Sequence, residues 1–318
     1  MSVWQPIVEK RIGWLFGLSD SIAIVEAQNP DLLVSVTNGT MIVASDYSGQ
    51  HKEATHEAYS FLVTTDEALK DWLPSLQAFR QRWLPDGRRM SFKKLNEPLR
   101  QRASWPFLDT ATCLSGNLIT ILVDRQVGSF MSGGPVAAKE AFPDCFAANA
   151  NPGTVEKMLR LASFVALILS GLRREDQLSY WISDHDEALD SHERREQFAR
   201  LSTYLTFGAT GWRHAADHQF STTELSKAPY WSEDLAAFAD LAAGAFCKLS
   251  SYLPAFSSSG ERNWLTQMAS SDIESLRARA IGDWLAKRRG ALRHVLLRLE
   301  LDRDCKIRTS AQAFLPPS

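Results

Sequence analysis

Three aspartates of this chain stand at the ends of apolar, strand-like runs. Asp46 follows "TMIVAS", Asp124 closes "NLITILVD" and Asp184 follows "LSYWIS". A carboxylate in the middle of a buried strand would cost several kcal/mol, whereas one at the C-terminal end of a strand points into the crevice where α/β sheets bind ligands. The sequence therefore predicts that these side chains face a ligand-binding crevice.

A fourth aspartate, Asp240, lies inside the apolar face of the predicted helix "EDLAAFADLAAGAF". An aspartate near a core needs a partner, and a divalent cation shared with the strand-end carboxylates would supply one. Small neighbours such as Ala243 and Gly244 would let this helix approach the sheet closely. A short Asp240 side chain needs that approach in order to reach a metal held by Asp46.

Carboxylates that are forced together repel one another, and binding of Mg²⁺ or Mn²⁺ turns this repulsion into a binding site. Such ions activate water and stabilise the leaving oxygen when a phosphodiester is hydrolysed. We therefore expect Asp46, Asp184 and Asp240 to hold Mg²⁺ or Mn²⁺. The sequence leaves open whether Asp184 or Asp186 is the ligand, since both lie in "SDHDE".

Each aspartate also has a purely structural interpretation. Asp46 precedes "YSGQ" and would form an Asx turn, and Asp240 would bond to a nearby backbone group or arginine. The pair in "SDHDE" would lie in a solvated loop. For Asp124, a local ion pair with Arg125 is the favoured interpretation.

The elements that must position these residues alternate between strands and helices. Asn38-Gly39 separates two apolar runs and predicts an antiparallel hairpin of 31–36 with 40–45. Hydrophobic periodicity predicts the later elements: strands at 58–65, 117–124, 177–183 and 218–225, and helices at 66–83, 154–171 and 232–253. Hairpin strands followed by strand-helix alternation predict an α/β fold, with a mixed sheet covered by helices.

Composition limits the possible classes of protein. The chain has 318 residues, 45% of them hydrophobic, and a net charge of -2, so it can bury a core but shows no global basic excess for nucleic acid or a membrane. Its four cysteines form no CxxC pair, which argues against a disulfide scaffold and a cysteine zinc site. No signal-peptide pattern and no run of about 18 apolar residues occurs. We expect a cytoplasmic protein that does not bind membranes.

Four segments resemble, in the same order, those of the domain of unknown function family numbered 3800. They are "IVASDYSG", "RMSFKKL", "LSYWISDHDEA" and "EDLAAFADLAAGAF". That family is considered ribonuclease H-like: its first strand ends in Asp-Glu-Ser-Gly, a basic segment with a lysine follows, a later strand ends in Asp, and a helix carries Ala-Asp-Leu-x-Ala-Gly.

The resemblance implies metal-binding positions at Asp46, Asp184 and Asp240, and a phosphate-binding lysine at Lys93 or its neighbour Lys94. It covers residues 31–253, which we take as a ribonuclease H-like domain. An N-terminal segment, 1–30, precedes it and a C-terminal helical extension, 254–318, follows. Tyr47 stands where the family has Glu, so this chain lacks that acid.

The sequence thus favours a nuclease that hydrolyses phosphodiesters of DNA or RNA with a divalent metal. The alternative is a catalytically silent ribonuclease H-like subunit of a larger bacterial complex, favoured by Tyr47 and by the near-neutral charge. Both the nuclease and the silent subunit are compatible with a protein partner or a homo-oligomer. A zinc hydrolase built on His214 and His218 ranks third, because "HQFSTT" favours a strand that begins at the second histidine.

Overall fold

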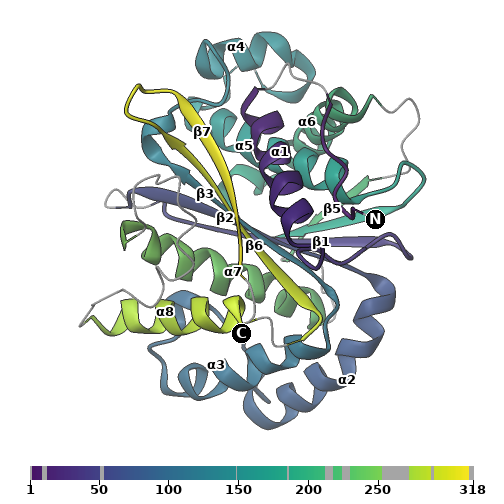
Figure 1. Cartoon of the computed structure of the whole chain (residues 1–318), viewed down its shortest axis with the longest axis vertical. Coiled ribbons are helices and arrows are strands. Elements are labelled where there is room, and N and C mark those ends of the chain that lie inside the picture. The colour runs from purple at the N-terminus through teal and green to yellow at the C-terminus, as the bar shows by residue number, and fades with distance from the viewer. Residues whose placement is uncertain are drawn as a thin grey trace.

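A seven-stranded mixed sheet runs through the middle of the protein, with helices on both faces (Figure 1). The computed structural model describes residues 2–8, 13–50, 54–147, 149–184, 186–211, 218–223, 230–252, 272–287 and 290–314. The predicted α/β class, with a mixed sheet covered by helices, is confirmed. None of the helices in these ranges combines the length and the apolar character needed to cross a membrane.

The strands lie in the order β5-β4-β1-β2-β3-β6-β7. Their bounds are β1 Met41–Ser48, β2 His56–Thr65, β3 Gly116–Asp124, β4 Ser179–Ser183, β5 His218–Thr222, β6 Leu292–Leu301 and β7 Ile307–Ala313. The pairs β1-β2, β2-β3 and β6-β7 are antiparallel, and β1-β4, β4-β5 and β3-β6 are parallel. Strands β1, β3, β4, β5 and β6 therefore run in one direction, and their C-terminal ends lie at one edge of the sheet.

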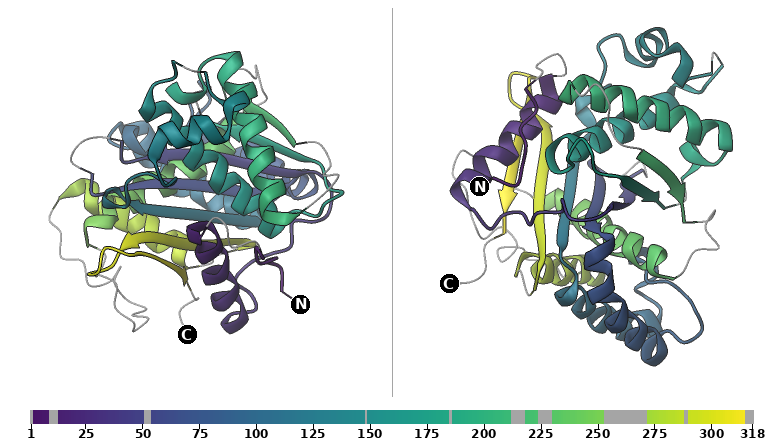
Figure 2. Two further views of the ribbon diagram at one scale, coloured as in Figure 1. Left: turned by 90° about the horizontal axis from the view of Figure 1, so that it is seen from above. Right: turned by 90° about the vertical axis from the view of Figure 1, so that its right-hand side faces the viewer.

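The helices form a layer on each face, as both views in Figure 2 show. Their bounds are α1 Gly13–Gln28, α2 Asp66–Trp83, α3 Pro98–Thr110, α4 Gly134–Ala141, α5 Pro152–Leu172, α6 His192–Thr210, α7 Trp231–Leu249 and α8 Ile273–Ala286. One core joins α1, α5 and α6 to the sheet, and the other joins α2, α3, α7 and α8 to the opposite face. We call these the α5 face and the α7 face.

Strand β1 divides its side chains between the two faces. Val43 belongs to the core of the α5 face, whereas Ile42 and Ala44 belong to that of the α7 face. Both edges of β1 are paired, one with β2 and the other with β4. This central position means that each residue of β1 is held in a fixed direction by the pleat.

The predicted hairpin at Asn38-Gly39 is wrong, because residues 31–36 form no strand. Both edges of β1 are already occupied, so no edge is left for this segment. Side chains bind its backbone instead: Asn117 of β3 accepts from the Val34 N–H at 2.9 Å and donates to the Val34 carbonyl at 2.8 Å. The hairpin that does form joins β1 to β2.

The C-terminal strands belong to the same sheet as the rest. β6 pairs with β3, and β7 pairs with β6 at the edge. Helix α1 lies against this edge in Figure 1, and the Ser21 hydroxyl is 3.2 Å from that of Thr309. The segment that we expected to be an extension after residue 253 thus supplies two strands of the sheet.

Candidate functional site

Asp46 lies within β1, paired with Ser60 of β2, and the strand continues two residues beyond it to Ser48. The alternation that sends Ile42 and Ala44 to the α7 face sends Asp46 there too. Asp46 is half-buried. The Asp46 carboxylate therefore lies between the sheet and the helices that cover the α7 face.

Asp184 is the first residue after β4. Its backbone N–H donates to the Ser45 carbonyl at 2.8 Å, which extends the β1-β4 pairing by one residue and fixes Asp184 beside Asp46. The Thr223 hydroxyl, just beyond β5, donates to Oδ1 of Asp184 at 2.8 Å. Neighbouring parallel strands therefore hold Asp184 at the C-terminal edge of the sheet.

Asp240 comes from the middle of α7, which packs across β1 and β2. Its carboxylate accepts hydrogen bonds from the Phe92 N–H, at 2.7 Å, and from the Ser91 side chain. These donors belong to the segment 88–95 between α2 and α3, which includes a 3-10 turn over Phe92–Lys94. The basic segment "RMSFKKL" thus lies against α7 at the carboxylates.

Arg89 of this segment is the cation that meets the carboxylates. Its two terminal nitrogens donate to both oxygens of Asp184, at 2.5 and 2.6 Å. These hydrogen bonds to Asp184, and then the negative charges of Asp184, Asp46 and Asp240, raise the pKa of the guanidinium. The sequence pointed to a lysine of the segment, but the structure brings Arg89 to the site, while Lys93 and Lys94 are exposed.

The electrostatics show that the three carboxylates act on one another. Burial raises the pKa of Asp46 well above its usual value, and the negative charges of Asp240 and then Asp184 raise it further. The pKa of Asp240 is also raised, chiefly by burial, although its hydrogen bonds from Phe92 and Ser91 oppose the shift. Residues far apart in the sequence thus form one cluster, which we call the carboxylate cluster: Asp46, Asp184 and Asp240.

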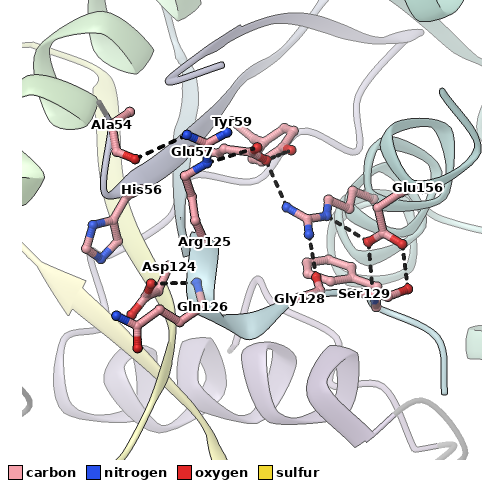
Figure 3. Close-up of polar contacts among 12 residues, drawn as sticks. Ala54, His56, Glu57, Tyr59, Asp124, Arg125, Gln126, Gly128, Ser129 and Glu156 are labelled. Carbon is pink, nitrogen blue, oxygen red and sulfur yellow. Dashed lines mark hydrogen bonds and ion pairs between the residues drawn. The ribbon is translucent and has the colours of Figure 1, made fainter. Parts of the chain in front are cut away.

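The remaining predicted acids lie elsewhere. Asp186 accepts from the Ala188 N–H at 2.9 Å and forms an ion pair with Lys157 of α5, so it does not join Asp46. Asp124 caps the 3-10 turn Arg125–Val127 by accepting from the Gln126 N–H at 2.9 Å (Figure 3). Of the two candidates in "SDHDE", only Asp184 faces the cluster.

Tyr47, in the position where the resembling family has an acid, points away from the cluster. Its ring packs beside Tyr59 on the α5 face, and its hydroxyl lies 2.7 Å from that of Ser45 and 2.9 Å from that of Ser183. A side chain at position 47 follows the pleat to the α5 face, opposite Asp46. An acid at this position would therefore not extend the cluster without a change in the strand.

Glu57 does not replace the acid that is absent at Tyr47. It lies on the α5 face with Tyr59, near Glu156 of α5 and Ser129 (Figure 3). Arg160 bridges the two glutamates, 2.8 Å from Glu57 and 2.9 Å from Glu156. This group is a separate ion-pair network on the other side of the sheet.

The zinc alternative needs His214 and His218 on the same helix. His218 is instead the first residue of strand β5, as predicted. Its Nδ1 lies 2.9 Å from the Ser179 hydroxyl, and burial, together with the positive charge of Arg173, lowers its pKa to about 4. His214 lies outside the described residues. Within the described ranges, no group of three His, Cys, Asp or Glu side chains is placed to hold a metal ion.

The chemistry of the carboxylate cluster nevertheless fits a hard divalent cation. Its donors are carboxylate oxygens, the ligands that Mg²⁺ and Mn²⁺ prefer. All three residues keep part of their surface open to solvent. In the arrangement seen here, however, the oxygens of Asp184 are engaged by Arg89 and Thr223. A cation that binds Asp184 must compete with these hydrogen-bond donors.

Compared with known proteins, the chain matches no protein family and no curated protein sequence. The resemblance to the domain of unknown function family 3800 therefore stays a prediction from the quoted residues.

Gly244 offers a direct test of how the basic segment is seated on α7. A Cβ at this position would overlap the Phe92 side chain. We expect Gly244→Ala to cost about 1–3 kcal/mol of unfolding free energy through overpacking, and to weaken the Phe92 bond to Asp240. Urea unfolding measures the first effect.

The matched control for Gly244 is Gly208, an exposed residue of α6 whose added Cβ meets no atom within 4 Å. Gly208→Ala should stabilise the protein by roughly 0.5–1 kcal/mol, because alanine loses less backbone entropy in a helix. If Gly244→Ala stabilised the protein as Gly208→Ala does, the close contact between α7 and Phe92 would be disproved.

Proposed function

We propose that this protein hydrolyses phosphodiester bonds of nucleic acid with the help of Mg²⁺ or Mn²⁺ bound at the carboxylate cluster. The observation that carries the proposal is the convergence of Asp46, Asp184 and Asp240 from two strands and a helix. Burial, and then the negative charges of Asp240 and Asp184, raise the pKa of Asp46. A protein with no use for this repulsion would gain stability by losing one of the acids.

The arrangement also supports the ribonuclease H-like assignment. The resemblance places acids on the first strand, at the end of a later strand and on a helix. In this fold those three acids are the ones that meet, although strands and helices separate them along the chain. Agreement between a sequence pattern and convergence in space supports one shared site more than either does alone.

The residues divide into two roles. Asp46, Asp184 and Asp240 would hold the cation, which would supply an activated water and stabilise the leaving oxygen. Three cations of the basic segment would meet the phosphates of the substrate: Arg89, which binds Asp184, and the exposed Lys93 and Lys94. These cations can neutralise a polyanion locally although the whole chain is close to neutral.

A second candidate, a catalytically silent ribonuclease H-like subunit, is favoured by one observation. Arg89 already neutralises part of the cluster by its two bonds to Asp184. In a protein that never binds metal, such an ion pair would be a permanent structural feature. Metal affinity and nuclease activity separate the two candidates.

The test is a cleavage assay on labelled single- and double-stranded RNA and DNA, with Mg²⁺, with Mn²⁺ or with a chelator. We expect metal-dependent cleavage of at least one substrate. Asp46→Asn should reduce the rate by at least about a hundredfold, since even residues behind metal ligands contribute 10–100-fold. Asp124→Asn, a strand-end aspartate outside the cluster, is the matched control and should retain activity. Cleavage that persists in the chelator, or in Asp46→Asn, would contradict the proposal.

A further inference from the structure

Other arginines hold the backbone of Arg89, whereas its side chain is partly exposed. Its carbonyl accepts from Nε of Arg100 at 2.8 Å, and the preceding carbonyl, of Arg88, accepts from the buried Arg80 at 2.7 Å. Met90, the next residue, is fully buried. The Arg89 side chain, in contrast, is 35% exposed. The long side chain can therefore leave Asp184 while the segment stays in place.

The two hydrogen bonds between Arg89 and Asp184 engage the carboxylate oxygens that a cation would bind. Both oxygens of Asp184 accept from the guanidinium, and Oδ1 also accepts from Thr223. Arg89 has donors only and cannot itself ligate a metal. A divalent cation at Asp184 would also repel the guanidinium beside it. A cation that takes both oxygens of Asp184 would therefore displace Arg89.

We propose that Arg89 is a displaceable counterion of the carboxylate cluster, which competes with the divalent cation for Asp184 and turns to the substrate phosphate once the cation is bound. This inference deepens the proposed function and rests on it. In the empty site, Arg89 limits the repulsion among the carboxylates. In the loaded site, the same guanidinium is free to bind a phosphate through two parallel hydrogen bonds.

The charges of the cluster determine the order in which the metal and the nucleic acid bind. When all three carboxylates are ionised, one guanidinium does not balance them, and the metal-free cluster is then negative and repels a phosphate. A divalent cation removes the repulsion and releases Arg89 in the same step. Nucleic acid should therefore bind tightly only after the metal, and the metal should bind more tightly when Arg89 is absent.

The experiment is calorimetric titration of Mn²⁺ into the full chain, comparing the wild type with Arg89→Gln and Arg88→Gln. Arg88 is the matched control because its neighbours are Asp86 and Glu97 rather than the cluster. We expect Arg89→Gln to bind Mn²⁺ about tenfold more tightly, because the cation no longer has to displace charged hydrogen bonds from Asp184. Arg88→Gln should bind as the wild type does.

Arg89→Lys supplies a second variant that keeps the charge. Lysine is a point charge without the two-pronged fork, so Mn²⁺ affinity should fall between those of the wild type and Arg89→Gln. With Mn²⁺ saturating, Arg89→Gln should bind a labelled oligonucleotide several-fold more weakly than Arg88→Gln does. Thermal melting of each variant checks that it is folded.

The outcomes separate this inference from the proposed function. Equal or weaker Mn²⁺ binding by Arg89→Gln would overturn the competition and leave the proposed function standing. Binding by Arg89→Gln but not by the wild type would support the competition and favour the silent subunit. Binding by neither protein would overturn both.

Discussion

Asp46→Asn should make the metal-free protein more stable and abolish its stabilisation by Mg²⁺ or Mn²⁺. In the folded protein, burial and the charges of Asp240 and Asp184 disfavour the ionised form of Asp46. An amide has nearly the same shape and no charge, so it removes this repulsion. The same change removes a ligand oxygen that carries charge. The two effects have opposite signs, which no simple loss of packing would produce.

The measurement for Asp46→Asn is thermal unfolding in a chelator and then over a range of metal concentrations. At a concentration about 100 times its Kd, a cation adds about 2.7 kcal/mol to the stability of a protein that binds it only when folded. We expect this increase in the wild type and in Asp124→Asn, which caps a turn outside the cluster. A wild type that does not respond to metal would remove the main support for the proposed site.

The pH dependence of stability provides an independent check on Asp46. Its pKa is higher in the folded protein than in the unfolded chain, so the folded state binds more protons in the interval between the two values. Stability of the metal-free protein should therefore fall as the pH rises from about 3.9, the unfolded value, through the folded pKa. Asp46→Asn should flatten this fall, and its advantage over the wild type should be largest above the folded pKa.

Arg160→Met should cause a large loss of stability. Arg160 is 9% exposed and bridges Glu57 and Glu156, which are 20% and 16% exposed. It also donates to the Gly128 carbonyl at 2.5 Å, and its guanidinium lies 4.8 Å from the centre of the Phe130 ring. Methionine fills part of the volume but leaves Glu156 without this cation and Glu57 with Arg125 at 4.0 Å. Removal of one partner from such a group costs about 3–5 kcal/mol.

Urea unfolding of Arg160→Met measures this loss, with Arg200→Met as the matched control. Arg200 pairs with Glu196 across 3.8 Å at the surface of α6, where both side chains are more than half exposed. That change should cost no more than about 1 kcal/mol. Adding Glu57→Gln and Glu156→Gln to Arg160→Met should recover much of the loss, because no unpaired charge then remains. A loss in Arg160→Met as small as that in Arg200→Met would show that the network does not stabilise the fold.

Arg160→Met should leave metal binding unchanged in the molecules that remain folded. The network lies on the α5 face, whereas the carboxylate cluster lies on the α7 face. The sheet separates the two groups of charges. Parallel loss of metal affinity would indicate that the two faces are coupled through β1 and β2.

The local elements were predictable because they depend on periodicity and caps. The helix expected at 66–83 is α2, Asp66–Trp83, with Thr65 as its N-cap. The strand expected to begin at His218 is β5. The hairpin at Asn38-Gly39 was wrong for a tertiary reason. Turn chemistry describes only a local preference, and it could not show that β2 and β4 occupy both edges of β1.

The sequence by itself determined which acids were available and what surrounds them: aspartates beside apolar runs, and one, Asp240, within an apolar helix face. Only the tertiary structure decided which of them meet. Asp184 and Asp186 are two residues apart beyond the end of a strand, where the pleat no longer sets direction, so pairing with Ser45 and with Lys157 sends them to different neighbours. Arg89 could not be chosen over Lys93 for the same reason, since ion pairs between distant segments depend on how the chain packs and leave no periodic signal in the sequence.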